Sequence, residues 1–193
     1  MITQSLEDCE GNLTNCFKLL NSFDVLLHRR MIMGQLDQHC VTLLQMFAED
    51  LKTTHEYFIT YHANPPHGAF LNLPKCVGAI HWSRGLRDRV EHPIHKLRNL
   101  DPHFDEREEA KATVGEYSSL CEHLADYENG KVTEWAAGVE AGSQAKLKLP
   151  LLERDMATRL LKVNFDPGLV KMLREVKYFL LLQIDVPDSA LKI

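Results

Sequence analysis

The chain has 193 residues, of which 45% are hydrophobic and 25% are charged, and its formal net charge is −5 when histidine is neutral. This apolar fraction can build a core, which excludes wholesale disorder, and the acidic balance provides no basic field for binding nucleic acid. No apolar run approaches the roughly 20 residues that a membrane span needs, and the N-terminus lacks a secretory pattern. The five cysteines contain no Cys-x-x-Cys motif, so we predict that they are reduced cytosolic thiols.

Apolar residues recur at steps of three and four along the first third of the chain, the spacing of one helix face. The first stripe, from Leu13 to Leu27, predicts a helix over 8–29, and Gly34 interrupts the pattern. A second stripe predicts a long helix over 35–62, which suits packing in a bundle or a short coiled coil. Its apolar residues are Leu36, Cys40, Leu43, Phe47, Leu51, Phe58 and Tyr61.

A proline-rich stretch from His62 to Pro74 predicts a loop, because proline lacks the backbone donor that a helix interior needs. A helix over 75–99 follows. Pro93 lies within it and removes the hydrogen bond to the carbonyl of Arg89, so we expect a kink or a break there. The apolar face of this helix, expected to lie in the core, contains Ala79, Trp82, Leu86, Val90 and Leu97.

Two further helices are predicted on either side of a turn. They cover 106–127 and 131–141, and Asn129-Gly130 is the turn signal between them. Trp135 lies on the apolar stripe of the second helix, which favours core packing over stacking on a ligand.

Two short apolar runs replace the helical stripes in the C-terminal part. They flank a polar segment from Glu153 to Arg159 and predict a β-hairpin within 147–165. The expected fold class is therefore mainly α, with elongated helical bundles and one small β-hairpin near the C-terminal end. The expected domains are a helical bundle segment over 1–146 and, over 147–193, the hairpin followed by the start of the next helical bundle.

A last helix is predicted over 167–182. Asp166 can cap its free amides, Pro167 occupies the first helical position, and Phe165 is placed for a hydrophobic staple with Val170. Pro187 ends the run. The apolar stripe of this helix is expected to contain Leu169, Leu173, Val176 and Leu180.

No motif for phosphate binding or nucleophilic catalysis is present. Gly-x-x-x-x-Gly-Lys-Ser/Thr, Gly-x-Gly-x-x-Gly and Gly-x-Ser-x-Gly are all absent. Cys76 and His81 lack an orienting third group, and the carboxylates near Glu108 lack surroundings that would make one an acid and the other a base. We therefore predict no catalytic, cofactor-binding or metal-binding residue.

The ten histidines form two loose groups that could be considered for zinc. His-Glu-x-x-His is missing, and Pro93 disturbs the helix where the second group lies, so structural histidines are favoured over a metal site. A metal-dependent hydrolase that uses these histidines remains an alternative. The groups are His55, His62 and His67, and His81, His92 and His95.

Three stretches in order carry a family-like pattern. The first, Asn12–Phe23, contains Asn-Leu, Cys-Phe and Ser-Phe, and the second, Asn72–Pro93, contains Asn-x-Pro, Gly-Ala-Ile, Trp, Leu and Pro. The third and most specific combines Val163–Pro167, Leu173–Tyr178 and Val186-Pro187. Together they resemble the N-terminal tail, or stem, of dynein heavy chains, and the third stretch is most similar to axonemal chains of the outer-arm β type. Lys75-Cys76 departs from the family pattern and leaves the subtype open.

The resemblance implies a non-catalytic tail segment, a fragment of a longer microtubule motor that drives ciliary beating. It implies association with other dynein heavy chains, with intermediate and light chains, and indirectly with the axonemal doublet microtubule, but not with nucleic acid or membrane. The implied location is the cytoplasm, the cytoskeleton and the axoneme of a cilium or flagellum. ATP and Mg are expected in the motor domain of the parent chain, with no cofactor in this segment. The alternative is a generic helical scaffold unrelated to dynein.

An assembly segment should leave part of its apolar surface uncovered. The helix Gln35–Tyr61 is the first expected contact surface, and the basic stretch Arg84–Arg98 is the second, as a place where an acidic partner could be steered in. The alternative is that the apolar stripes are used entirely inside one bundle.

Overall fold

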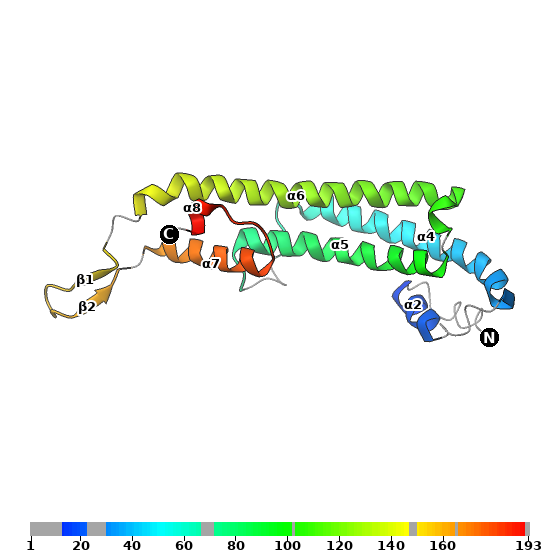
Figure 1. The fold of residues 1–193 in the computed structure, drawn as a ribbon, viewed down its shortest axis with the longest axis horizontal. Helices are drawn as coiled ribbons and strands as arrows, with labels where there is room; N and C mark the ends of the chain where they lie inside the picture. Colours follow the sequence, from blue (N-terminus) through cyan, green and yellow to red (C-terminus); the bar gives the residue numbers. More distant parts are fainter. Residues whose placement is uncertain are drawn as a thin grey trace. The chain divides into compact units, whose positions relative to one another are not determined.

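The computed structural model describes residues 13–22, 30–66, 72–101, 103–146, 150–164 and 166–191, and within them the chain is mainly α-helical (Figure 1). This confirms the predicted fold class, including a small two-stranded sheet near the C-terminal end. None of the described helices is both long enough and apolar enough for a membrane span. The elements are α2 (Leu13–Ser22), α4 (Arg30–Tyr61), α5 (Lys75–Leu100), the 3-10 helix η2 (Phe104–Glu106), α6 (Glu108–Lys146), β1 (Leu152–Arg154), β2 (Leu161–Val163), α7 (Pro167–Leu181) and α8 (Asp188–Leu191).

The chain forms two compact units. The first unit contains Met1–Asn64 and Arg84–Leu124, and the second contains Pro65–Ser83 and Ala125–Ile193. Helices α5 and α6 therefore contribute residues to both units. These packing units do not follow the expected division at residue 147, and whether 147–193 begins a further helical bundle stays a prediction.

The apolar stripes that the sequence predicts supply much of the core of the first unit, but the buried Leu44, Ile94, Ala110 and Leu120 lie outside those stripes. Helical spacing brings these side chains to one face of each helix, and burying each of them stabilises the fold by about 1.5–3 kcal/mol. The buried apolar residues are Cys16, Phe17 and Leu20 of α2, Leu43, Leu44, Phe47, Leu51 and Phe58 of α4, Leu86, Val90, Ile94 and Leu97 of α5, and Ala110, Leu120 and Leu124 of α6, with Phe104 of η2.

The predicted interruptions at glycine are wrong. Helix α4 begins at Arg30 and continues through Gly34, and α6 continues through Asn129-Gly130 where a turn was expected. Glycine in a helix interior costs only about 1 kcal/mol relative to alanine. Burial of Trp135 and Val139, which lie beyond the glycine in α6, outweighs that penalty.

The predicted break at Pro93 is also wrong, because α5 is continuous from Lys75 to Leu100. Proline inside a helix costs about 3 kcal/mol. Here Pro93 is itself buried, next to the fully buried Ile94 and close to the fully buried Val90. Apolar burial on both sides of the proline keeps the helix intact, while the alternative expectation of a kink stays a prediction.

Some predicted features lie partly outside the described residues. The structure describes the part of the expected helix 8–29 that forms α2, and it describes the expected loop His62–Pro74 except for residues 67–71. Phe165, half of the expected hydrophobic staple, lies outside the described residues. Its expected partner Val170 is 49% exposed.

The second unit packs the start of α5 and the end of α6 against α7 and α8. Its buried cluster contains Val77, Ile80, Trp135, Val139, Val176, Phe179 and Ala190. The short helix α8 was not predicted. Helix α7 ends at Leu181, before it reaches Pro187, so the proline is not what ends it. The Pro187 carbonyl instead accepts a hydrogen bond of 2.9 Å from the amide of Ala190, which begins a new turn.

The predicted start of α7 is confirmed. The Asp166 side chain accepts hydrogen bonds from the amides of Gly168 at 2.6 Å and Leu169 at 3.3 Å, and Pro167 occupies the first turn. The predicted stripe is wrong at Leu173 and Leu180, which are exposed. The buried face of α7 instead contains Glu175, Val176 and Phe179.

Candidate assembly surface

The first expected contact surface, the stripe of α4, is largely used inside the first unit. Its residues Leu43, Phe47, Leu51 and Phe58 are all buried. The alternative, that the stripe packs within a bundle, therefore holds for this part of α4. The side chains of residues 31–39 of the same helix lie outside the described set.

The second expected surface, the basic stretch Arg84–Arg98, has much of its charge already paired. Arg89 forms an ion pair with Asp50 of α4, and the Nε of Arg98 lies 3.0 Å from a carboxylate oxygen of Asp105. Exposed ion pairs contribute little stability, but they neutralise the field that would attract an acidic partner. This stretch is therefore a weak candidate for attracting an acidic partner protein.

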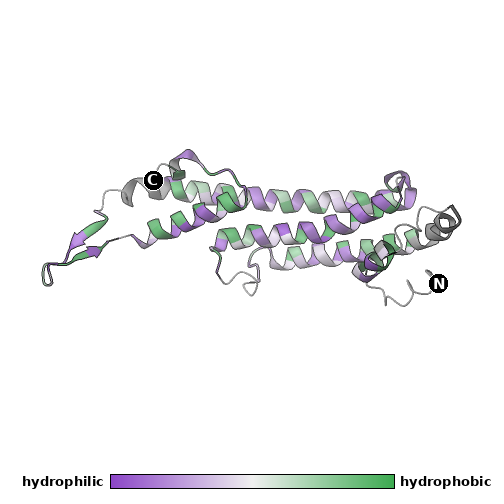
Figure 2. Ribbon diagram, turned by 60° about the horizontal axis from the view of Figure 1, so that its bottom comes forward, coloured by the Kyte–Doolittle hydropathy of each residue, from purple (hydrophilic) through white to green (hydrophobic). Residues whose placement is uncertain are grey.

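The hairpin exposes apolar side chains that the sequence did not single out as a contact surface. In the antiparallel register Leu152 pairs with Val163, Glu153 with Lys162 and Arg154 with Leu161. Directly opposed residues point to the same face of a sheet, and alternate residues point to opposite faces. Figure 2 shows hydrophobic residues on both strands. The exposed apolar residues of this segment, between 55% and 92% accessible, are Leu151, Leu152, Met156, Leu160, Leu161 and Val163.

The two faces of the hairpin differ in chemistry. Leu152, Val163 and Leu161 share one face with Arg154, and the Glu153–Lys162 pair occupies the other. We call the first set the apolar hairpin face. A two-stranded hairpin is only marginally stable alone in water, and clustered exposed apolar residues mark interaction sites.

The turn of the hairpin is fixed by Asp155. Its carboxylate accepts hydrogen bonds from the amides of Ala157 at 2.9 Å and Thr158 at 3.4 Å, and its own amide donates to the Leu160 carbonyl at 3.0 Å. The Ala157 amide, followed by Thr158, lowers the pKa of the Asp155 carboxyl. Local hydrogen bonds therefore hold the hairpin in shape without burying its apolar face.

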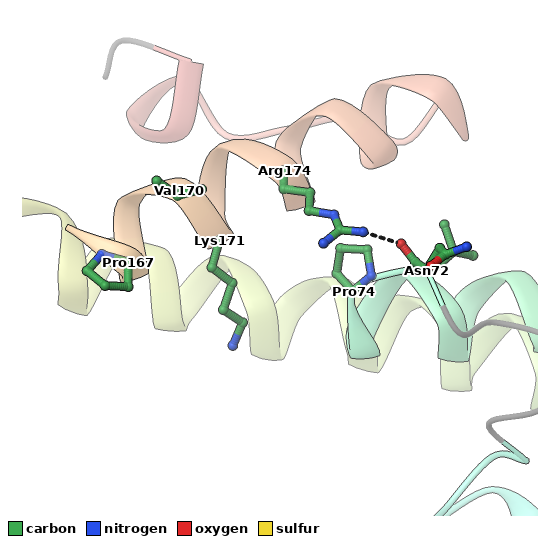
Figure 3. Close-up of a pocket in the computed structure, with 7 residues that line it drawn as sticks. Asn72, Pro74, Pro167, Val170, Lys171 and Arg174 are labelled. Atoms are coloured by element: carbon green, nitrogen blue, oxygen red, sulfur yellow. Dashed lines mark hydrogen bonds between the residues drawn. The ribbon is translucent and has the colours of Figure 1, made fainter. Parts of the chain in front are cut away.

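The third family-like stretch and the beginning of the second, from Asn72, lie in the second unit. The indole of Trp135 donates to Glu175 and lies 4.4 Å from the Phe179 ring, centroid to centroid. The Arg174 guanidinium donates to the carbonyl of Asn72, at the edge of an open cavity of about 310 Å³ (Figure 3). These contacts hold α7 on α6 and on the segment that leads into α5. The cavity is lined by Asn72, Leu73, Pro74, Pro167, Val170, Lys171 and Arg174.

Cys76 does not have the surroundings of a nucleophile. Its Sγ donates to the carbonyl of Lys131 at 3.4 Å, and burial, reinforced by the charge of Glu175, raises the pKa of the thiol to about 11. A catalytic thiol needs a lowered pKa. The absence of a catalytic pair at Cys76 and His81 stays a prediction.

The structure distributes the histidines along the helices. His55 stacks on His123 with ring centroids 5.7 Å apart, and the Nδ1 of His62 lies 2.7 Å from the Ile59 carbonyl oxygen. Across the described ranges, no group of three or more His, Cys, Asp or Glu side chains could hold a metal ion. His67 lies outside those ranges, and the expected lack of a metal site stays a prediction. Exposed positions on α5 are occupied by His81, His92 and His95.

Comparison with known proteins identifies the family of the whole chain. The family model for the dynein heavy chain, N-terminal region 1, matches residues 1–193. The chain is 38% identical to the dynein beta chain of the flagellar outer arm of Chlamydomonas reinhardtii, over 98% of this chain and 4% of that protein. It is 32% identical to the ciliary dynein beta chain of Heliocidaris crassispina, over 100% of this chain and 4% of that protein. It is 28% identical to human dynein axonemal heavy chain 9, over 91% of this chain and 4% of that protein. The chain thus spans about 4% of the length of these relatives.

Proposed function

Because this chain belongs to the dynein heavy chain family, as its N-terminal region 1, we propose that it is a non-catalytic tail segment that joins one axonemal heavy chain to another. The relatives named above are chains of flagellar, ciliary and axonemal dyneins, which supports a location in the axoneme of a cilium or flagellum. The family match also argues against the alternatives of an unrelated scaffold and of a metal-dependent hydrolase.

The apolar hairpin face is the observation that carries this proposal. Burying a leucine or valine side chain contributes about 1.5–3 kcal/mol, so Leu152, Leu161 and Val163 provide a favourable term large enough to matter in association. Association itself costs on the order of 4–15 kcal/mol, so apolar contact alone is insufficient. A further contribution must come from the backbone.

The outer edges of the hairpin can supply that contribution. The sheet contains β1 and β2 alone, so each strand has one edge without a strand neighbour in the described part of the chain. Such an edge is a template for pairing with a strand of another chain, which adds main-chain hydrogen bonds. We therefore assign the hairpin as the contact with the hairpin of a second heavy chain.

The further partners follow from the family alone. Intermediate and light chains would bind the tail, and the doublet microtubule would be held indirectly. ATP and Mg would be bound by the motor domain of the parent chain, whereas this segment would bind neither. No contact in the described residues assigns these partners to a particular surface.

Sedimentation equilibrium tests the proposal. The 193-residue chain is measured alone and mixed with the corresponding region of a second axonemal heavy chain. We expect a dimer in at least one sample, and we expect Leu152→Ser with Leu161→Ser to abolish it. Glu153→Ser with Lys162→Ser, on the opposite face of the same strands, is the matched control and should retain association. Monomers in every sample, or equal loss in both double variants, would contradict the proposal.

A further inference from the structure

Helix α7 has a second apolar stripe on the side opposite its buried face. Val176 and Phe179 are buried in the second unit, whereas Val170, Leu173 and Leu180 are each about half exposed. Steps of three and seven residues place these three on one side of a helix, and Leu181, 67% exposed, lies beside them. Single exposed leucines are ordinary on a protein surface, but a surface helix normally places polar residues where this stripe lies. We call this set of four residues the outer stripe.

The exposed charged residues of α7 are all positive. Lys171, Arg174 and Lys177 are exposed, and Lys177 lies within the stripe between Leu173 and Leu180. The only acidic residue in the α7 sequence, Glu175, is turned inward and accepts the hydrogen bond of Trp135. Lys171 reaches back to this carboxylate, with its Nζ 3.8 Å from the Oε1 of Glu175, and Arg174 donates to the carbonyl of Asn72. Lys177 is therefore the α7 cation that lies within the outer stripe itself.

The position of Lys177 limits what can cover the stripe. An apolar helix would bury the ammonium group without a partner, which is costly, and a basic helix would add repulsion. A carboxylate opposite Lys177 would satisfy its charge and fix the register, as a polar group at a core position does in coiled coils.

We propose that the outer stripe docks an amphipathic helix of a partner polypeptide, with leucine-like residues at heptad spacing and an Asp or Glu facing Lys177. The docking is separate from the hairpin, because the outer stripe and the apolar hairpin face share no residue. The heavy-chain contact and this site can therefore succeed or fail independently.

A basic apolar helix can also attract an anionic membrane surface. The packing of α7 favours the helix partner, because Val176, Phe179 and the Trp135–Glu175 bond hold the helix in the second unit. Four apolar residues in a narrow stripe match one groove of a facing helix. Binding of anionic vesicles through the outer stripe is therefore an outcome of the test that would overturn the proposal.

Fluorescence anisotropy with two synthetic helical peptides tests the site on the full 193-residue chain. Both peptides have leucine at the a and d heptad positions, and they carry either Glu or Lys at the flanking positions. We expect the Glu peptide to bind and the Lys peptide to bind at least about tenfold more weakly. Leu173→Ser with Leu180→Ser should weaken the Glu peptide by about tenfold or more, because two leucine contacts are lost. The control Leu152→Ser with Leu161→Ser on the hairpin should leave its binding unchanged.

Charge reversal separates specific docking from general attraction. Lys177→Glu should shift the preference from the Glu peptide toward the Lys peptide, whereas Lys162→Glu, with the same change in net charge, should leave the preference as it is. Vesicles of phosphatidylserine and phosphatidylcholine serve as the membrane probe. The proposal is overturned if neither peptide binds, if both bind equally, if the two charge variants behave alike, or if only vesicles bind the outer stripe.

Discussion

The indole Nε1 of Trp135 donates a hydrogen bond of 2.9 Å to the Oε2 of Glu175, and so joins α6 to α7. Both residues are 8% exposed, and the nearest cation to this carboxylate, the Nζ of Lys171, lies 3.8 Å from the other oxygen. A buried carboxylate needs such partners, because desolvation strongly penalises the charged form. This single contact fixes which side of α7 faces the core.

Trp135→Phe should test the energetic weight of this contact. Phenylalanine keeps an aromatic ring beside Phe179 but removes the donor, which leaves an oxygen of buried Glu175 without its partner. We expect the free energy of unfolding to fall by about 1–3 kcal/mol, the usual cost of an unsatisfied buried group. Urea unfolding measures the change.

Glu175→Gln is the matched control for that variant, because the amide oxygen still accepts from the indole while the charge is removed. It should destabilise the chain less than Trp135→Phe does. In a double-mutant cycle the two changes should be strongly non-additive. Additive effects would show that the two side chains do not act as a pair.

Asp166→Ala should destabilise α7 by about 1 kcal/mol, because it removes the acceptor for the amides of Gly168 and Leu169. Asp166→Asn should be close to neutral, since its amide oxygen can still accept. Urea unfolding of the two variants in parallel decides the matter: equal losses would mean that the side chain does not act as a cap.

Cys76 should react as an ordinary thiol only at high pH. Burial raises the pKa of its thiol from 9.0 to about 11. The thiolate therefore forms at a higher pH in the folded chain than in the unfolded chain. The stabilisation linked to this shift is therefore fully present below pH 9 and is lost as pH rises through about 11. Alkylation with iodoacetamide, followed by mass spectrometry, should reach half its maximal rate near pH 11. Half-maximal labelling near pH 9 in the folded chain would show that burial does not raise the pKa of the Cys76 thiol.

Asp155→Ala should loosen the turn of the hairpin without changing the helical units. The carboxylate holds the amides of Ala157 and Thr158, and every residue of the two strands is exposed. We expect weaker association between heavy-chain regions at an unchanged urea midpoint. Asp155→Asn retains an acceptor and should keep most of the association. If Asp155→Ala associates as well as the unchanged chain, the shape of the turn does not contribute to the contact between heavy chains.

Periodicity predicted the existence of the helices better than their limits. The stripes through Phe47 and Val90 correctly placed residues of the core. The interruptions at Gly34, Pro93 and Asn129-Gly130 were wrong, because α4, α5 and α6 are continuous there. At Pro93 and Gly130 the local penalties of about 1–3 kcal/mol are outweighed because neighbouring side chains are buried. Such competition depends on tertiary packing and is not visible in a short sequence window.

The contact surfaces were harder to predict for a related reason. A stripe at helical spacing shows that one side of a helix is apolar, but α7 has two apolar sides, and Leu173 and Leu180 belong to the exposed one. The buried side is set by the partners of Glu175 and Phe179 on α6, which lie 40 or more residues away in sequence. The hairpin itself was predicted, and its exposure was not, because alternation in three-residue strands does not reveal what covers them.

Hydrogen exchange of the hairpin amides tests the central claim most directly. The segment 152–163 is compared in the isolated 193-residue chain and in the assembled heavy chains purified from axonemes. Our account predicts rapid exchange of the edge amides of β1 and β2 in the isolated chain and strong protection in the assembly. Equal and rapid exchange of this segment in both samples, with protection confined to the helices, would contradict heavy-chain association through the hairpin.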